Sequence, residues 1–239
     1  IDLGSGHGHH DKVRTGGAKS KFGIGIDQLS EAARLAQQHG LRIGVLHAHL
    51  GSGILDAAHF GRVYQELLAL AEMVPSVRAL NIGGGFGIAA HPDDSALDLT
   101  AVGELLATIK QAHPQYELWM EPGRYLVAEA GVLLARVNAI KQKYGRDFIG
   151  LDAGMHNLLR PALYDAHHPI VNLTRLDEAA TMRADIVGPI CESGDVLGGE
   201  RELPQTQAGD VFLIAQAGAY GAVMASNYNR RAAADEVML

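Results

Sequence analysis

The sequence predicts an α/β fold over residues 1–130 and a mostly β domain over residues 131–239. Three observations predict it. Helical and strand-like segments alternate in the first part, each strand there ends in a Gly-rich or charged cluster, and the second part is a series of short strand-like runs with turn residues between them. Clusters at the ends of parallel strands are typical of a (β/α)8 barrel, and an open doubly wound sheet would carry them in the same place.

The alternation can be followed element by element along the chain. The helices are predicted at residues 28–39, 57–73 and 97–113, and the strands at residues 1–3, 41–49, 77–82 and 116–120. Helices of this length between strands indicate βαβ units and therefore a parallel sheet. In the second part, strands are predicted at residues 131–140, 147–152, 184–187, 210–215 and 236–239.

The composition favours a small-molecule substrate. Of the 239 residues, 47% are hydrophobic and 20% are charged, with a formal net charge of −7. No Lys/Arg-dense stretch offers a surface for nucleic acid or an anionic membrane. No apolar run approaches the roughly 20 residues that a membrane-spanning helix needs. The single cysteine, Cys191, excludes an internal disulfide framework and fits a reducing compartment, so we expect a cytoplasmic protein.

The start of the sequence runs from a short apolar piece directly into a Gly/His loop, without an initiator Met. We therefore expect the chain to begin in mid-domain. His7, His9 and His10 lie on this loop without a clear carboxylate or Cys partner. No metal site is predicted from them.

Two Gly-rich clusters are candidate cofactor loops. Gly83, Gly84 and Gly85, with Gly87, follow an apolar strand, where glycines allow backbone N–H groups to approach a phosphate, although a tight turn without a ligand has the same pattern. The motif G-x-G-x-x-G is not satisfied, which weakens a dinucleotide site. The run from His49 to Ser52 has the same two interpretations, a ligand site or a turn without a ligand. In a ligand site, the serine hydroxyl could donate to a phosphate and the imidazole could stack on a flat ligand.

Two charged or nucleophilic motifs stand out. In Glu121-Pro122-Gly123-Arg124, a carboxylate beside a pyridine nitrogen would keep that nitrogen protonated, and the guanidinium would bind a phosphate or carboxylate. Solvation at the surface is the alternative. Cys191 lies in the loop-like run 191–195, where the thiol is either inert packing or a catalytic group.

Taken in order, these motifs resemble the fold-type III pyridoxal-phosphate decarboxylases over essentially the whole chain. The pieces that carry the resemblance are Gly8-His9-His10, Thr15-Gly16-Gly17, HLGSG (49–53), IGGGFGI (82–88), EPGR (121–124), CESGD (191–195) and GAYGAVMASNYN (218–229). The resemblance implies that residues 1–130 are the C-terminal half of a pyridoxal-phosphate-binding (β/α)8 barrel of the TIM type. It also implies a homodimer with shared active sites. The family's Schiff-base lysine lies in an N-terminal segment that this sequence does not contain.

Within the family, two motifs resemble the diaminopimelate decarboxylases rather than the ornithine decarboxylases. They are the run Arg160 to Tyr164, similar to the segment that grips the distal end of the substrate, and Glu192, where ornithine decarboxylases usually have Asp. The resemblance assigns Ser52, Gly84, Gly85, Glu121, Pro122, Gly123, Arg124 and Tyr220 to pyridoxal 5'-phosphate. It assigns Arg124, Arg160, Tyr164, Glu192 and Tyr220 to the substrate, and Cys191 and His49 to catalysis.

The implied reaction is decarboxylation of meso-diaminopimelate at its D-configured centre, which gives L-lysine and carbon dioxide. Cys191 is expected to return the proton. Two alternatives stay open: a decarboxylase of another basic amino acid, of the ornithine or carboxynorspermidine type, and a noncatalytic regulatory homologue that has kept the fold.

Overall fold

The computed structural model describes residues 1–4, 7–8, 16–17 and 20–238. The chain divides into two compact units. The N-terminal unit comprises residues 1–89 and 94–125, and the C-terminal unit comprises residues 90–93 and 126–239. Each unit has its own hydrophobic core.

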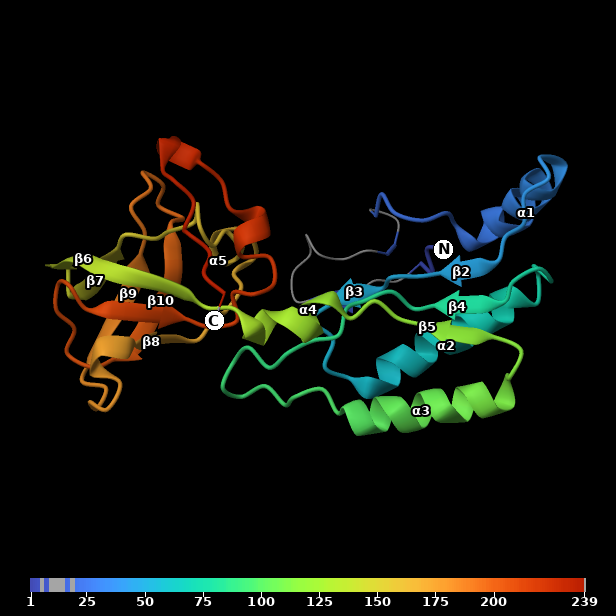
Figure 1. Cartoon of the computed structure of the whole chain (residues 1–239), viewed down its shortest axis with the longest axis horizontal. Helices are drawn as coiled ribbons and strands as arrows, with labels where there is room; N and C mark the ends of the chain where they lie inside the picture. The colour runs from blue at the N-terminus through green and yellow to red at the C-terminus, as the bar shows by residue number, and fades with distance from the viewer. Residues whose placement is uncertain (5–6, 9–15, 18–19, 239) are drawn as a thin grey trace. The chain divides into compact units, whose positions relative to one another are not determined.

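The N-terminal unit is built on a three-stranded parallel sheet of order β2-β4-β5. The strands are β2 (Val45–His47), β4 (Ala79–Asn81) and β5 (Glu117–Trp119), and the helices are α1 (Leu29–Gln38), α2 (Ala57–Ala71) and α3 (Leu99–Ala112). A further parallel pair joins β1 (His7–Gly8) to β3 (Gly51–Ser52). Figure 1 shows β2, β4 and β5 side by side, with α2 and α3 nearby. The predicted alternation of helices and parallel strands is confirmed.

Helix ends and helix contacts in this unit follow from particular residues. Asp56 and Asp98 are the N-caps of α2 and α3, and their carboxylates accept hydrogen bonds from Ala58 N–H and Ala101 N–H at 3.0 Å each. On α2, a Cβ at Gly61 would lie 2.5 Å from the Leu105 side chain of α3. The missing side chain therefore allows the two helices to pack closely.

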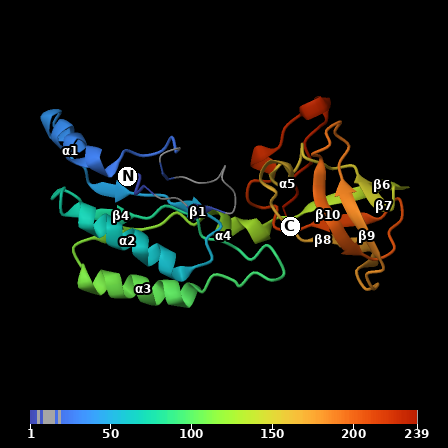
Figure 2. The same ribbon diagram turned by 180° about the vertical axis from the view of Figure 1, so that it is seen from behind.

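The C-terminal unit contains a six-stranded sheet of order β10-β9-β7-β6-β11-β8. Its strands are β6 (Leu133–Lys143), β7 (Arg146–Leu151), β8 (Ile170–Asn172), β9 (Met182–Val187), β10 (Val196–Leu203) and β11 (Val211–Ile214). All neighbours pair antiparallel except β7 and β9, which are parallel. Figure 2 shows these strands from behind. The predicted mostly β region is thus confirmed.

The helical elements outside α1–α3 are short. They are the α-helices α4 (Gly123–Val127) and α5 (Arg160–Tyr164) and the 3-10 helices η2 (Ile26–Gln28), η3 (Ala128–Ala130), η4 (Leu173–Arg175), η5 (Ala222–Met224) and η6 (Tyr228–Arg230). In the part of the chain that the structure describes, no helix is long and apolar enough to cross a membrane.

Two strand predictions are wrong. Residues 236–238 form no strand, and Val237 is 81% exposed, so this apolar run found no strand edge to pair with. Residues 1–3 contribute only one isolated bridge, between Asp2 and Gly25. Strands β8 and β10 were not predicted, since β8 has only three residues and β10 contains Gly198 and Gly199.

Candidate active site

The N-terminal unit gathers its predicted loops at the carboxyl edge of the parallel sheet. The loop after β2 carries His49, the loop after β4 carries Gly83–Gly87, and the loop after β5 carries Glu121. Backbone hydrogen bonds join them: Glu121 N–H donates to Gly83 C=O and Ile54 N–H donates to Gly85 C=O, both at 2.8 Å. Segments separated by more than 30 residues in the sequence therefore form one site, as parallel strands require.

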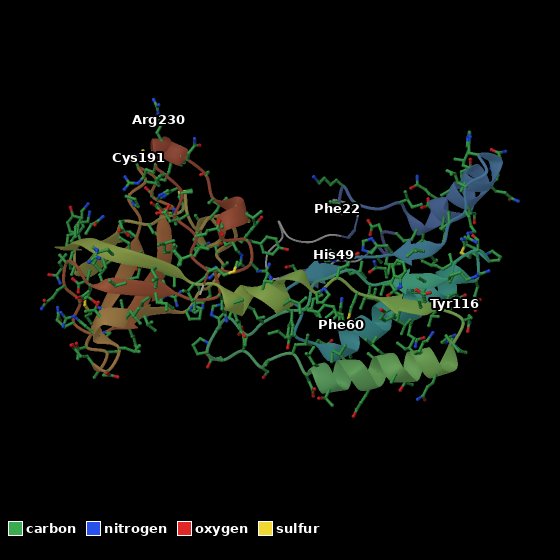
Figure 3. All side chains as sticks on the ribbon, viewed as in Figure 1. Phe22, His49, Phe60, Tyr116, Cys191 and Arg230 are labelled. Carbon is green, nitrogen blue, oxygen red and sulfur yellow. The ribbon has the colours of Figure 1, made fainter. Side chains whose placement is uncertain are left out.

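His49 is fixed in one tautomer. Its Nδ1 accepts a hydrogen bond from Gly84 N–H at 2.8 Å, so the ring proton is on Nε2. Burial lowers the pKa of His49 most, the nearby His47 lowers it further, and the Glu121 carboxylate opposes both. The imidazole is therefore neutral at neutral pH, which suits stacking on a flat ring. Figure 3 shows His49 beside β3.

The Glu121 carboxylate is held by two side chains on neighbouring strands. Asn81 Nδ2 donates to Oε1 at 2.8 Å, and His47 Nε2 lies 3.7 Å from Oε2. Asn81 is itself fixed, because its Oδ1 accepts from Gly83 N–H at 2.9 Å. The Glu121 side chain remains 54% exposed, so its carboxylate is accessible to a ligand. Neither Asn81 nor His47 was predicted from the sequence to belong to the site.

The glycine loop fits a phosphate by two observations. A Cβ at Gly84 would lie 2.5 Å from Glu121 C=O, and a Cβ at Gly85 would lie 2.6 Å from Gly51 C=O, so the loop packs too closely for side chains. Among the described residues, the N–H groups of Gly85 and Phe86 donate to no backbone carbonyl. Unpaired backbone donors on a Gly-rich loop are a common anion site.

Arg124 and Ser52 add side-chain donors to the same unit. Arg124 Nη2 donates to Ser52 Oγ at 3.2 Å, which brings together two of the predicted cofactor residues. Pro122 links Glu121 to α4, which begins at Gly123, and Gly123 N–H donates to Glu121 C=O at 2.8 Å. A guanidinium, a hydroxyl and backbone N–H groups match the donors that a pyridoxal phosphate group requires.

The predicted substrate residues Arg160 and Tyr164 lie in the C-terminal unit, at the two ends of α5. Arg160 is 8% exposed, and its Nη1 lies 2.9 Å from His168 Nε2. A spacing of four residues places Arg160 and Tyr164 on the same face of the helix. The structure thus holds a buried guanidinium at the start of α5, a group suited to binding a carboxylate.

Cys191 and Glu192 lie on an exposed loop of the C-terminal unit, and Figure 3 shows Cys191 near Arg230. Asn229 Nδ2 donates to Cys191 Sγ at 3.1 Å, and the Tyr228 hydroxyl donates to Glu192 Oε1. The hydrogen bond and negative charge of Glu192 raise the pKa of Tyr228. Tyr228 and Asn229 belong to the motif 218–229 that carries the family resemblance, but no role was predicted for them from the sequence.

The buried Asp195 carboxylate holds the backbone of this loop in place. Its carboxylate accepts Met155 N–H at 2.5 Å and Ile190 N–H at 2.7 Å, and it is 3% exposed. A Cβ at Gly154 or Gly188 would collide with it. The last residue of the predicted CESGD motif therefore fixes the backbone that carries Cys191.

Tyr220 has a left-handed backbone, with φ of 60°, and its side chain is half exposed. It lines a cavity of about 910 Å³ in the C-terminal unit, together with Asn157 and Gly218. Among the described residues, no group of His, Cys, Asp or Glu side chains is arranged to hold a metal ion. His9 and His10 lie outside the described residues.

Comparison with known proteins gives consistent similarities. Residues 26–218 match the family model for the pyridoxal-dependent decarboxylase C-terminal sheet domain. A diaminopimelate decarboxylase of Methanothermobacter thermautotrophicus is 38% identical, over 98% of this chain and 57% of the relative. The Zymomonas mobilis diaminopimelate decarboxylase is 41% identical, over 96% of this chain and 55% of the relative.

Solved structures show similarity to the same group of proteins. A diaminopimelate decarboxylase crystal structure matches with a TM-score of 0.85 and 37% identity, over 95% of this chain and 58% of that chain. The Helicobacter pylori diaminopimelate decarboxylase complexed with L-lysine matches with a TM-score of 0.83 and 32% identity, over 92% and 55%. The chain thus spans somewhat more than half the length of the relatives it matches.

Proposed function

The chain belongs to the pyridoxal-dependent decarboxylases, and from that premise we propose that the protein carrying it decarboxylates meso-diaminopimelate to L-lysine. The structural observation that carries this proposal is Arg160 at the start of α5, which is only 8% exposed and has its Nη1 2.9 Å from His168 Nε2. A buried guanidinium suits the carboxylate at the distal end of this substrate, which ornithine lacks. Relatives with this activity in their names support the same choice.

We assign the cofactor to the loops of the N-terminal unit, which we take to be the C-terminal half of a (β/α)8 barrel. Pyridoxal phosphate, when bound, supplies a ring that accepts electrons from the carbon losing its carboxylate. Glu121 holds the pyridine N–H, and His49 packs on the ring. The other assigned cofactor residues of this unit, which bind the phosphate or shape its loops, are Ser52, Gly84, Gly85, Pro122, Gly123 and Arg124. Tyr220 of the C-terminal unit is also assigned to the cofactor.

We assign recognition of the distal L-amino acid to two charged groups. Arg160, with Tyr164, binds its carboxylate, and Glu192 binds its ammonium group. Arg124 and Tyr220 contact the substrate nearer the cofactor. Matching both charges stabilises a buried zwitterion, because a missing partner leaves a charge unpaired.

Cys191 is assigned the proton transfer that completes the reaction. The bond between the D-configured carbon and its carboxylate breaks, carbon dioxide leaves, and the Cys191 thiol protonates the same carbon. Asn229 and the Asp195 anchor hold this thiol in place. We further propose a cytoplasmic homodimer in which Cys191 and Glu192 complete the active site of the partner subunit.

A substrate panel tests the proposal with the holoenzyme. The panel is meso-diaminopimelate, L-ornithine and carboxynorspermidine. We expect kcat/KM to be highest for diaminopimelate by at least about thirtyfold, because the other two substrates lack the distal carboxylate that pairs with the buried Arg160 guanidinium. Preference for ornithine or carboxynorspermidine would make the protein a decarboxylase of that type. Failure to release carbon dioxide from any of the three would support a regulatory homologue.

A further inference from the structure

We propose that His168 is a positioning residue for the substrate, which orients the Arg160 guanidinium as a neutral imidazole with its proton on Nδ1. This inference rests on the proposed function, because it concerns the residue assigned to the distal carboxylate. No role for His168 was predicted from the sequence.

The hydrogen bonds of His168 fix its tautomer from both sides. The ring is fully buried, at 0% exposure, with Nδ1 2.9 Å from Ala215 C=O and Nε2 2.9 Å from Arg160 Nη1. A carbonyl oxygen only accepts hydrogen bonds, so Nδ1 carries the proton. A guanidinium only donates, so Nε2 presents its lone pair. A doubly protonated ring would satisfy the carbonyl and lose the arginine.

The surrounding backbone keeps the ring in register with Arg160. Asp165 ends α5 in the left-handed conformation, with φ of 52°, and the chain turns back toward Arg160, whose C=O accepts Ala166 N–H at 3.4 Å. Beyond the turn, Arg201 Nη2 donates to His168 C=O at 3.1 Å, and Ala215 N–H donates to Pro169 C=O at 2.9 Å. His168 is therefore held against the end of β11 on one side and α5 on the other.

A neutral acceptor has a specific consequence for carboxylate binding. The guanidinium is planar, so one hydrogen bond at Nη1 restricts the plane in which its remaining donors lie. This contact adds no negative charge, whereas a carboxylate in the same place would compete with the substrate for Arg160. His168 thus orients the cation without weakening its attraction for an anionic ligand.

Two substitutions of His168 separate the two ring nitrogens. In His168→Gln the side-chain oxygen can reach the place of Nε2 and accept from Arg160. In His168→Asn the shorter side chain can reach the place of Nδ1 and contact Ala215 but not Arg160. Both variants keep a polar amide in the core, so each is the matched control for the other in thermal stability.

The measurement is the dissociation constant of the holoenzyme for L-lysine and for cadaverine, which is lysine without its carboxylate. We expect His168→Asn to weaken L-lysine binding by roughly 10-fold to 100-fold, the range for one hydrogen bond to a charged group. The dissociation constant for cadaverine should change by less than about threefold, which corresponds to less than about 0.7 kcal/mol. The absorbance of the bound cofactor should stay the same. His168→Gln should bind L-lysine almost as the unsubstituted protein does.

Two results would overturn the inference: equal changes for L-lysine and cadaverine in His168→Asn, which would mark a general packing role, or equal L-lysine affinities of the two variants. Failure of the proposed function looks different. In that case the unsubstituted holoenzyme itself would show no preference for L-lysine over cadaverine.

Discussion

Arg160→Ala is expected to reduce kcat/KM for meso-diaminopimelate by about thirtyfold to several thousandfold in the holoenzyme. The reason is that truncating one partner of a buried charge pair costs on the order of 2–5 kcal/mol. Arg160 is 8% exposed and lies in the C-terminal unit, whereas the loops assigned to the cofactor lie in the N-terminal unit. Bound pyridoxal phosphate, measured by absorbance, should therefore be unchanged.

A suitable control is Arg34→Ala, which removes an exposed arginine paired with Glu31 on α1. Exposed ion pairs contribute little, so activity should stay within about twofold of the unsubstituted protein. A parallel loss of activity and cofactor absorbance in Arg160→Ala would contradict the substrate assignment. It would show instead that the buried arginine supports the fold.

Cys191→Ala is expected to slow turnover by roughly 100-fold to 10,000-fold, the contribution typical of a positioned general acid. The thiol acts after carbon dioxide has left, so cofactor binding and substrate binding should both persist. Misplaced protonation should also appear as by-products in chromatography of the reaction mixture. Pre-steady-state measurements should show carbon dioxide release before lysine formation.

Asn229→Ala is the matched variant, because it removes the donor 3.1 Å from Cys191 Sγ and keeps the thiol. Its effect on turnover should be much smaller than that of Cys191→Ala. If Cys191→Ala kept normal turnover and a single product, the thiol would have only a structural role.

The sequence predicted the helices of the N-terminal unit well, and the ends of its strands less well. Helices α1, α2 and α3 begin and end within two residues of the predicted bounds. The first full strand was predicted at residues 41–49, and the strand in the structure is only Val45–His47. An apolar run reports burial, whereas a strand lasts only as long as its neighbour supplies hydrogen bonds.

In the C-terminal unit, two strands, β8 and β10, were not predicted from the sequence. Strand β10 contains Gly198 and Gly199, which lower the propensity for a strand. A Cβ at Gly198 would lie 2.6 Å from Arg201 Nε, so this glycine meets a packing need that only the folded chain reveals. Strand β8 gains its place from pairing with β11, which lies about 40 residues further along the chain.

For the candidate site, the sequence indicated which loops would gather but not what holds their side chains. Gly84, Glu121 and His49 were named from local motifs, and the strand ends bring them together. Asp195 was named only as the last residue of the motif 191–195, and His168 looks like an ordinary polar residue in the sequence. Their roles depend on contacts with Met155 and Ala215, about 40 residues away along the chain, which no local pattern contains.

The most direct measurement for the proposed reaction is turnover of meso-diaminopimelate by the holoenzyme in D₂O, with the product identified by chiral chromatography and mass spectrometry. We expect L-lysine and carbon dioxide in equal amounts, with one non-exchangeable deuterium on the ε-carbon of the lysine, because the exchangeable Cys191 thiol delivers the proton to the carbon that lost its carboxylate. D-lysine, deuterium on the α-carbon, or no lysine at all would contradict the account.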